Sequence, residues 1–115
     1  MILHLVTFRW KETVTPESVV RLCYELATFR RQMDCIVDYR FGPDLGLRQG
    51  NADFGVAALL ESPAAIGEYL DHPSHKELFN RVIAPMCESR TAVQIEVTGT
   101  AWSDTGGPAG QARPV

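Results

Sequence analysis

The sequence predicts an α+β sandwich with the element order β-α-β-β-α-β. Three observations predict this fold. Four segments have the β-branched, aromatic and alternating composition of strands, and two pairs, Thr15-Pro16 and Ser62-Pro63, open helical segments between them. A chain of 115 residues also leaves room for only one domain, so these elements must share one core.

The first predicted strand covers residues 2–10, which contain no helix breaker and are rich in β-branched and aromatic side chains. Successive side chains alternate across a strand, and both faces here carry apolar groups, so we expect both faces to be covered. One face carries Ile2, His4, Val6, Phe8 and Trp10, and the other carries Leu3, Leu5, Thr7 and Arg9.

The first helix is expected to begin at Pro16 and to end near Met33. Thr15 supplies a capping hydroxyl, and Glu17 places a negative charge near the positive end of the helix dipole. Apolar side chains then recur at the spacings of three, four and seven residues that form one buried stripe. The stripe consists of Val19, Leu22, Cys23, Leu26 and either Phe29 or Arg30.

Two further strands are predicted at residues 36–41 and 54–60, separated by a polar turn at residues 47–52. The motif Gly42-Pro43-Asp44 ends the alternation of the earlier strand. Alternation places Val37, Tyr39 and Phe41 on one face of that strand and Ile36, Asp38 and Arg40 on the other.

Proline residues divide the second helical region. Pro63 opens a short helix expected over residues 64–70, and Pro73 interrupts it, which places His72 at a corner. A second helical stretch is expected over residues 74–82, and Pro85 is expected to end it. The fourth strand, residues 91–98, has Thr91, Val93, Ile95 and Val97 on one face and Ala92, Gln94, Glu96 and Thr98 on the other.

The fourth strand closes a predicted domain of residues 1–98. Residues 99–115 are dominated by Gly, Pro, Ala and Ser, which predicts a flexible C-terminal tail with Trp102 as a residue that could dock. The complete element order is that of the ferredoxin-like fold. Its helices cover one sheet face, so apolar residues of the other face, such as Leu3 and Leu5, are expected to pack against a second copy in a homodimer.

Charge and cysteine content exclude several classes of function. Eleven basic against fourteen acidic residues give a net charge of −3, which argues against binding to nucleic acid or an anionic membrane. No segment reaches the roughly 20 apolar residues of a membrane span, and no secretion signal is present, so we expect a cytoplasmic protein. Cys23, Cys35 and Cys87 lack CxxC spacing and are expected to be reduced thiols, with no metal site and no cofactor.

Several separate motifs resemble the stress-responsive dimeric α/β barrel (Dabb) family over about residues 1–98. They are HLVTFRWK from His4, DYRFGPDLG from Asp38, NADF from Asn51 and YLDHPSH from Tyr69 to His75. Within this family, the chain is similar to polyketide cyclases of the olivetolic acid cyclase type and to a hydroxynitrile lyase. The resemblance implies a homodimeric, cofactor-independent enzyme of the cyclase or lyase type.

The cyclase pattern places catalytic roles on His4, Tyr69 and His75. An imidazole has a pKa suited to proton transfer near neutral pH, so one histidine could remove a proton next to a carbonyl while the other, or Tyr69, stabilises the oxyanion. Each residue also has a structural interpretation. His4 lies on an apolar strand face, His75 follows a helix break where it could bond backbone carbonyls, and Tyr69 could simply pack on a short helix.

The predicted pocket lies between the sheet and the helices and is apolar, which suits a small aromatic or polyketide-like ligand. Aromatic residues on the first helix of the cyclase correspond to Leu22, Cys23 and Leu26 here, which implies a different substrate. Arg9, Arg40 and Arg90 could rim the pocket or pair across the sheet, and exposed pairing is the favoured interpretation. The predicted substrate-binding residues are Val6, Phe8, Leu22, Cys23, Leu26, Val56 and Phe79.

Three alternative functions remain open at this point. The first is a non-catalytic, stress-associated dimer that binds a ligand. The second is a cofactor-independent monooxygenase, which would favour a tryptophan near the pocket, and Trp10 is the strand residue that could serve. The third is an assembly module, which predicts a core with no cavity large enough for a ligand.

Overall fold

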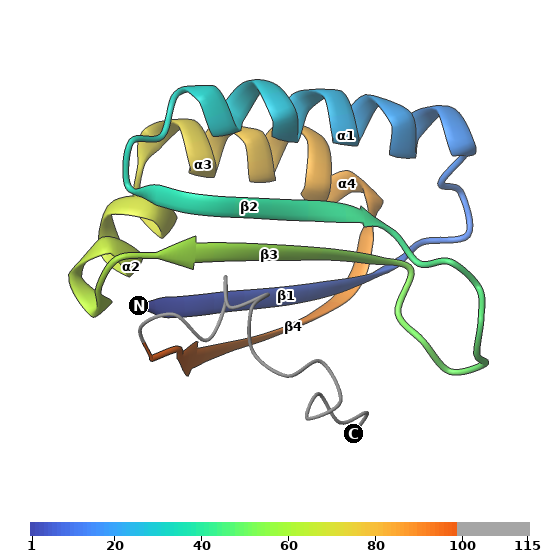
Figure 1. Ribbon diagram of the computed structural model, residues 1–115. Helices are drawn as coiled ribbons and strands as arrows, with labels where there is room; N and C mark the ends of the chain where they lie inside the picture. The colour runs from blue at the N-terminus through green and yellow to red at the C-terminus, as the bar shows by residue number, and fades with distance from the viewer. Residues whose placement is uncertain (99–115) are drawn as a thin grey trace.

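The computed structural model describes residues 1–98 and has the predicted ferredoxin-like fold (Figure 1). The four strands form one antiparallel sheet in the order β2-β3-β1-β4. The expected tail at residues 99–115, including Trp102, lies outside the described residues. The elements are β1 (Ile2–Trp10), α1 (Pro16–Arg31), β2 (Ile36–Pro43), β3 (Phe54–Leu60), α2 (Pro63–Leu70), α3 (Pro73–Leu78), the π-helix η1 (Phe79–Ile83), α4 (Ala84–Met86) and β4 (Cys87–Glu96).

The start of α1 follows the predicted capping chemistry, whereas the side-chain cap expected at Ser62 is not formed. The Thr15 hydroxyl accepts a hydrogen bond from the Ser18 amide at 3.2 Å, and Pro16 occupies the first turn of α1. Ser62 precedes α2 with extended backbone, but its side chain makes no capping bond. Pro63 therefore accounts for the start of this helix, because its fixed φ suits the first helical position.

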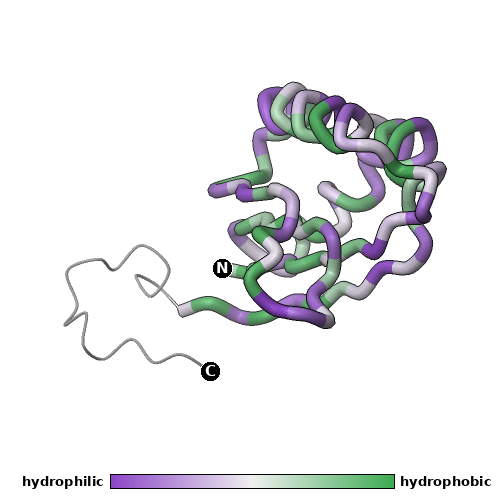
Figure 2. The backbone as a smooth tube through the Cα atoms, turned by 90° about the vertical axis from the view of Figure 1, so that its right-hand side faces the viewer, coloured by the Kyte–Doolittle hydropathy of each residue, from purple (hydrophilic) through white to green (hydrophobic). Residues whose placement is uncertain are grey.

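The core lies between α1 and the sheet face that the helices cover. Figure 1 shows α1 and α3 running side by side along the same side of the sheet. In Figure 2, hydrophilic and hydrophobic residues alternate along the helical layer, as expected for helices with one buried stripe. The buried core includes Leu22, Leu26 and Phe29 from α1, and Val6, Phe8, Phe54 and Val56 from the sheet.

The face assignment of β2 was wrong at its first residue. The pairing register with β3 shifts between Ile36 and Asp38, so a β-bulge lies at Val37. Ile36 pairs with Leu60 and is buried on the helix-covered face, whereas Val37 is exposed. The alternation rule assumes a strand without an extra residue, and it therefore placed Ile36 on the same face as Asp38 and Arg40.

The second half differs from the prediction around Pro85. The helix does not stop before this proline, because α4 contains Pro85 in its first turn. The preceding turn is a π-helix, in which the Ala84 amide donates to the Phe79 carbonyl. A proline at the start of a new helical turn removes no required hydrogen bond, so the chain stays helical through Met86. Strand β4 then begins at Cys87, earlier than the predicted Thr91.

No helix within residues 1–98 combines the length and the apolar character that a membrane crossing requires.

Candidate active site

His4 is a buried polar residue on the helix-covered face of the sheet, with 3% of its surface exposed. It pairs in register with Gln94 of β4, whose amide nitrogen Nε2 lies 2.8 Å from His4 Nδ1. Because an amide nitrogen donates, Nδ1 accepts, and the proton of neutral His4 lies on Nε2. Burial and then the charge of Arg90 lower the pKa of His4 below 6.5. At neutral pH, His4 is therefore a neutral hydrogen-bond donor.

His75 lies on α3 and faces an aromatic cluster. Its ring lies edge-on to Tyr69, with ring centroids 4.8 Å apart, and edge-on to Phe29 at 5.8 Å. Burial lowers its pKa to about 4, and the charges of His4 and Arg90 add to this effect against the opposing influence of Asp71. In residues 1–98, the imidazole of His75 makes no hydrogen bond to a backbone carbonyl.

The corner before Pro73 is held by a hydrogen bond to His72. The Nδ1 atom of His72 accepts a hydrogen bond from the Ser74 amide at 3.0 Å and caps α3. The two histidines thus have different environments: His72 caps α3 at the corner before Pro73, and His75 faces the interior.

Tyr69 lies between the two candidate histidines. Its ring centroid is 5.8 Å from that of His4, and its hydroxyl lies 3.1 Å from the hydroxyl of Tyr39. Burial raises the pKa of Tyr69 to about 12 and raises that of Tyr39 further, with the neighbouring phenol adding to the effect on Tyr39. Both phenols are therefore protonated at neutral pH and can act only as neutral hydrogen-bonding groups.

His4 and His75 both border two adjacent cavities. The inner cavity holds only about 30 Å³, because aromatic and aliphatic side chains nearly fill it. The outer cavity, between β4 and the α3–η1 segment, holds about 440 Å³. The inner lining is His4, Val6, Phe8, Leu26, Tyr39, Val56, Tyr69, Leu70, His75, Leu78, Phe79, Ile83 and Arg90. The outer lining is His4, Leu70, His75, Lys76, Phe79, Asn80, Arg90, Ala92 and Gln94.

The predicted site residues divide between these cavities. Tyr69 lies on the inner cavity, as do Val6, Phe8, Leu26 and Val56, whereas Phe79 borders both. Leu22 and Cys23 border neither of them: Leu22 is fully buried in the core, and Cys23 packs half-buried against it. Burial raises the pKa of the Cys23 thiol, which disfavours the nucleophilic thiolate.

Sequence reasoning missed Tyr39 and Gln94 as site residues and did not favour Arg90 for the cavity. The orientation of Tyr39 could have been predicted, since alternation placed it on the same strand face as Phe41. Gln94 and Arg90 are polar residues of β4, and only the pairing of Gln94 with His4 and of Arg90 with Phe8 turns them toward the cavity. Such a register is not readable from the strand alone.

The three arginines considered for the sheet have different environments. Arg40 forms an ion pair with Asp38 at 3.1 Å. Arg9 donates to the backbone carbonyls of Gly50 and Asn51. Arg90 instead borders the outer cavity, with its guanidinium carbon 5.7 Å from the centroid of the Phe79 ring. The favoured interpretation as an exposed pair therefore does not describe Arg90.

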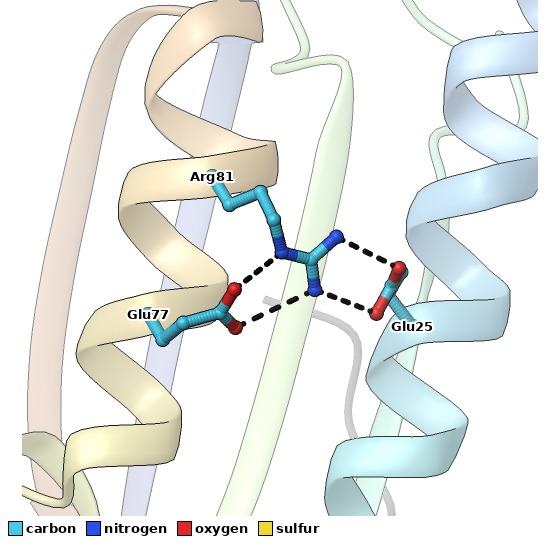
Figure 3. A network of polar contacts seen from close by, with 3 residues as sticks. All are labelled: Glu25, Glu77 and Arg81. Atoms are coloured by element: carbon cyan, nitrogen blue, oxygen red, sulfur yellow. Dashed lines mark hydrogen bonds and ion pairs between the residues drawn. The ribbon is translucent and has the colours of Figure 1, made fainter.

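A charged network holds the helical wall of the site against α1 (Figure 3). Arg81 of η1 donates to both carboxylate oxygens of Glu25 on α1, at 3.0 and 3.1 Å. Its guanidinium also pairs with Glu77 on α3. The network thus links α1, α3 and η1, the turn that carries Phe79.

Within the described range, 1–98, no group of three or more His, Cys, Asp or Glu side chains is placed to hold a metal ion. The site consists of two neutral imidazoles, a pair of protonated phenols and two cationic side chains, Lys76 and Arg90. Chemically, this set can accept a proton and donate hydrogen bonds to a developing oxyanion.

Comparisons with known proteins agree with this fold. Residues 2–97 match the family model described as Stress responsive A/B Barrel Domain. A search of curated proteins gave no significant match. Among solved structures, a dimeric ferredoxin-like protein of unknown function from Thermobifida fusca YX is 40% identical, with a TM-score of 0.78. That match covers 84% of this chain and 90% of the other.

Two more distant structures have stated activities. The hydroxynitrile lyase of Passiflora edulis is 16% identical, with a TM-score of 0.73, and the match covers 84% of this chain and 95% of the lyase. A protein described as an antibiotic biosynthesis monooxygenase is 19% identical, with a TM-score of 0.65, over 86% of this chain and all (100%) of that chain. At these identities the likeness shows a shared fold and leaves the chemistry to the site residues.

Proposed function

The chain belongs to the Dabb family of stress-responsive A/B barrel domains, and from that premise we propose that it is a homodimeric, cofactor-independent acid/base enzyme. Its reaction would be of the aldol cyclase or lyase type, on a small aromatic or polyketide-like carbonyl compound. One observation carries the proposal: His4 and His75, both neutral at neutral pH, border the same open cavity of about 440 Å³.

The two histidines would have different roles. The neutral imidazole of His75 removes a proton from the carbon next to a carbonyl, and the electron pair of that C–H bond moves onto the carbonyl oxygen. His4 donates its Nε2–H to that oxygen, because Nδ1 is occupied by Gln94. The enolate carbon then forms a bond to a second carbonyl carbon, and His75 returns the proton to the new alkoxide.

Tyr69 is a positioning residue in this proposal. It borders the inner cavity, its hydroxyl pairs with Tyr39, and its ring fixes His75 from the side. The Tyr69 ring, held by its hydrogen bond to Tyr39, thus packs against His75, and the substrate enters through the outer cavity.

The homodimer is proposed through the sheet face opposite the helices. On this face of β4, Val93 and Ile95 are 51% and 46% exposed, and they pair with Leu5 and Leu3 of β1. An apolar face on a sheet favours burial against another apolar surface. The related Thermobifida fusca structure is described as dimeric, which supports a second copy as the occupant.

The proposal is tested by hydrogen exchange next to carbonyl groups. A panel of aryl methyl ketones and linear 1,3-diketones is incubated with the protein in D₂O, and NMR follows the loss of the signals of the protons next to the carbonyl. We expect catalysed exchange in the wild type and its loss in His75→Gln. Because the pKa of His75 is about 4 and that of His4 lies below 6.5, the rate should be nearly independent of pH from about 7 to 8.

His72→Asn is the matched control, because His72 borders neither cavity and an asparagine can keep the helix cap. It should leave exchange unchanged. Exchange that persists in a folded His75→Gln variant, or wild-type protein no faster than buffer, overturns the proposal.

The alternatives are separated by the same variants. A non-catalytic binding dimer is favoured by the packing of His75 among Phe29 and Tyr69, and it predicts that His75→Gln lowers stability with no exchange to lose. The monooxygenase has less support, because Trp10 stacks on Phe8 at 5.4 Å and borders neither cavity. An assembly module does not account for the open outer cavity.

A further inference from the structure

The outer cavity is positively charged although the chain as a whole is acidic. Its lining includes two cationic side chains, Arg90 and Lys76, and none of its described lining residues is Asp or Glu. The chain carries a formal net charge of −3. The cavity is therefore a local positive region on an acidic protein, which is the arrangement that attracts a small anion.

Arg90 is available to such an anion. Its contact in the site is with the Phe79 ring, at 5.7 Å, and no carboxylate of residues 1–98 forms an ion pair with it. Arg40 and Arg81, by contrast, are each paired with carboxylates. A guanidinium contacting an aromatic ring keeps its N–H groups for a planar, bidentate acceptor.

The neutral His4 and the cationic Arg90 line the outer cavity from the same face of the sheet. His4 pairs with Gln94 and Phe8 pairs with Arg90 on the same face of β1 and β4, so Arg90 lies along the strands from His4. The positive charge of Arg90 contributes to the lowered pKa values of both His4 and His75. The surface between the charged and neutral ends is apolar, formed by Leu70, Phe79 and Ala92.

We propose that the outer cavity selects carbonyl compounds that also carry a carboxylate, with the carboxylate on Arg90 and the carbonyl directed to His4 and His75. Lys76 and Asn80 line the same cavity from the α3–η1 side. The carbonyl end of this assignment rests on the proposed function. The carboxylate end rests on Arg90 alone and can be tested without any turnover.

The test compares 4-acetylbenzoate with its neutral methyl ester, which differs from it by the charge and one methyl group opposite the ketone. Binding of each to the full-length protein is measured by isothermal titration calorimetry at low salt. We expect the wild type to bind the carboxylate about ten-fold or more tightly than the ester, as for a charge-assisted bidentate pair. Arg90→Gln should remove this preference, and Arg90→Lys should retain part of it.

Arg48→Gln is the matched control, since Arg48 is an exposed arginine that borders neither cavity. It should keep the full preference. Equal wild-type affinity for the two probes, no binding of the carboxylate, or a preference that survives in Arg90→Gln overturns the inference. Circular dichroism melting verifies that both Arg90 variants are folded.

The failure of this inference is distinguishable from that of the proposed function. Arg90-dependent preference for the carboxylate without catalysed exchange of the ketone methyl protons would retain the anion site and reject the enzyme. Catalysed exchange on neutral ketones without any carboxylate preference would retain the enzyme and reject the anion site.

Discussion

The imidazole of His75 lies edge-on against the phenol ring of Tyr69, with centroids 4.8 Å apart and an angle of 62° between the ring planes. Within this aromatic surrounding, burial is the largest cause of the lowered pKa of His75, about 4. The contact therefore links the ionisation of the proposed base to the packing of the residue that is proposed to position it.

This link predicts a pH dependence of stability. The pKa of His75 is about 4 in the folded state against 6.5 for an unperturbed histidine, so the unfolded chain binds more protons between these values. The contribution of His75 is complete above pH 6.5 and is lost as the pH falls toward 4. Urea unfolding at pH 7.5 and 4.5 should show a larger loss of stability in the wild type than in His75→Gln.

The comparison with His75→Gln is essential, because carboxylates also take up protons in this range. Equal losses in the two proteins would show that His75 has an ordinary pKa in the folded state.

The hydroxyl pair of Tyr39 and Tyr69 predicts a measurable coupling. Tyr69→Phe leaves the partly buried Tyr39 hydroxyl without its partner and should lower the free energy of unfolding by about 1–2 kcal/mol. Tyr39→Phe should have a similar effect. The double variant should lose less than the sum, because it leaves neither hydroxyl unpaired. Additive losses in a denaturation cycle would contradict the pairing.

The hydrogen bond between Gln94 and His4 predicts the tautomer of His4. In the wild type the proton lies on Nε2, because the Gln94 amide donates to Nδ1. In Gln94→Glu the carboxylate can only accept, so the proton should move to Nδ1 and the pKa of His4 should rise. Nitrogen NMR shifts of the His4 ring distinguish the two tautomers. The same tautomer in both proteins would show that Gln94 does not set it.

The exposed face of β4 predicts the assembly state. Val93→Asp places a charge among the apolar residues of that face and should convert the proposed dimer to a monomer in analytical ultracentrifugation. Val20→Asp makes the same change at a valine of α1 that is 70% exposed, and it should leave the dimer intact. A monomeric wild type, or a dimer that survives Val93→Asp, would reject this face as the interface.

Much of the fold was predictable because it depends on local chemistry. Thr15 and Pro16 mark the start of α1, and the apolar composition of residues 54–60 gives β3 with its observed ends. The errors occurred where one residue changed the local period. The extra residue at Val37 turned Ile36 to the other face, and the π-turn before Pro85 kept a helix going where a proline was expected to end it.

The candidate site was predictable only in part. His4, Tyr69 and His75 were predicted by the family resemblance. In the structure, the ring centroid of Tyr69 lies 5.8 Å from that of His4 and 4.8 Å from that of His75. Gln94 and Arg90 were not predicted as partners of that group. Their contribution depends on how β4 aligns with β1, and this alignment is fixed by long-range pairing rather than by their own sequence neighbours.

The hydrogen bond between His4 and Gln94 joins residues 90 positions apart in the chain. β1 leaves the ribosome before β4, so the tautomer of His4 is set only after β4 has docked. Contacts of such high sequence separation slow folding, because the chain must close a long loop before they form. A nascent chain that lacks β4 would expose β1 as an unpaired edge and would lack the Gln94 contact that sets the tautomer of His4.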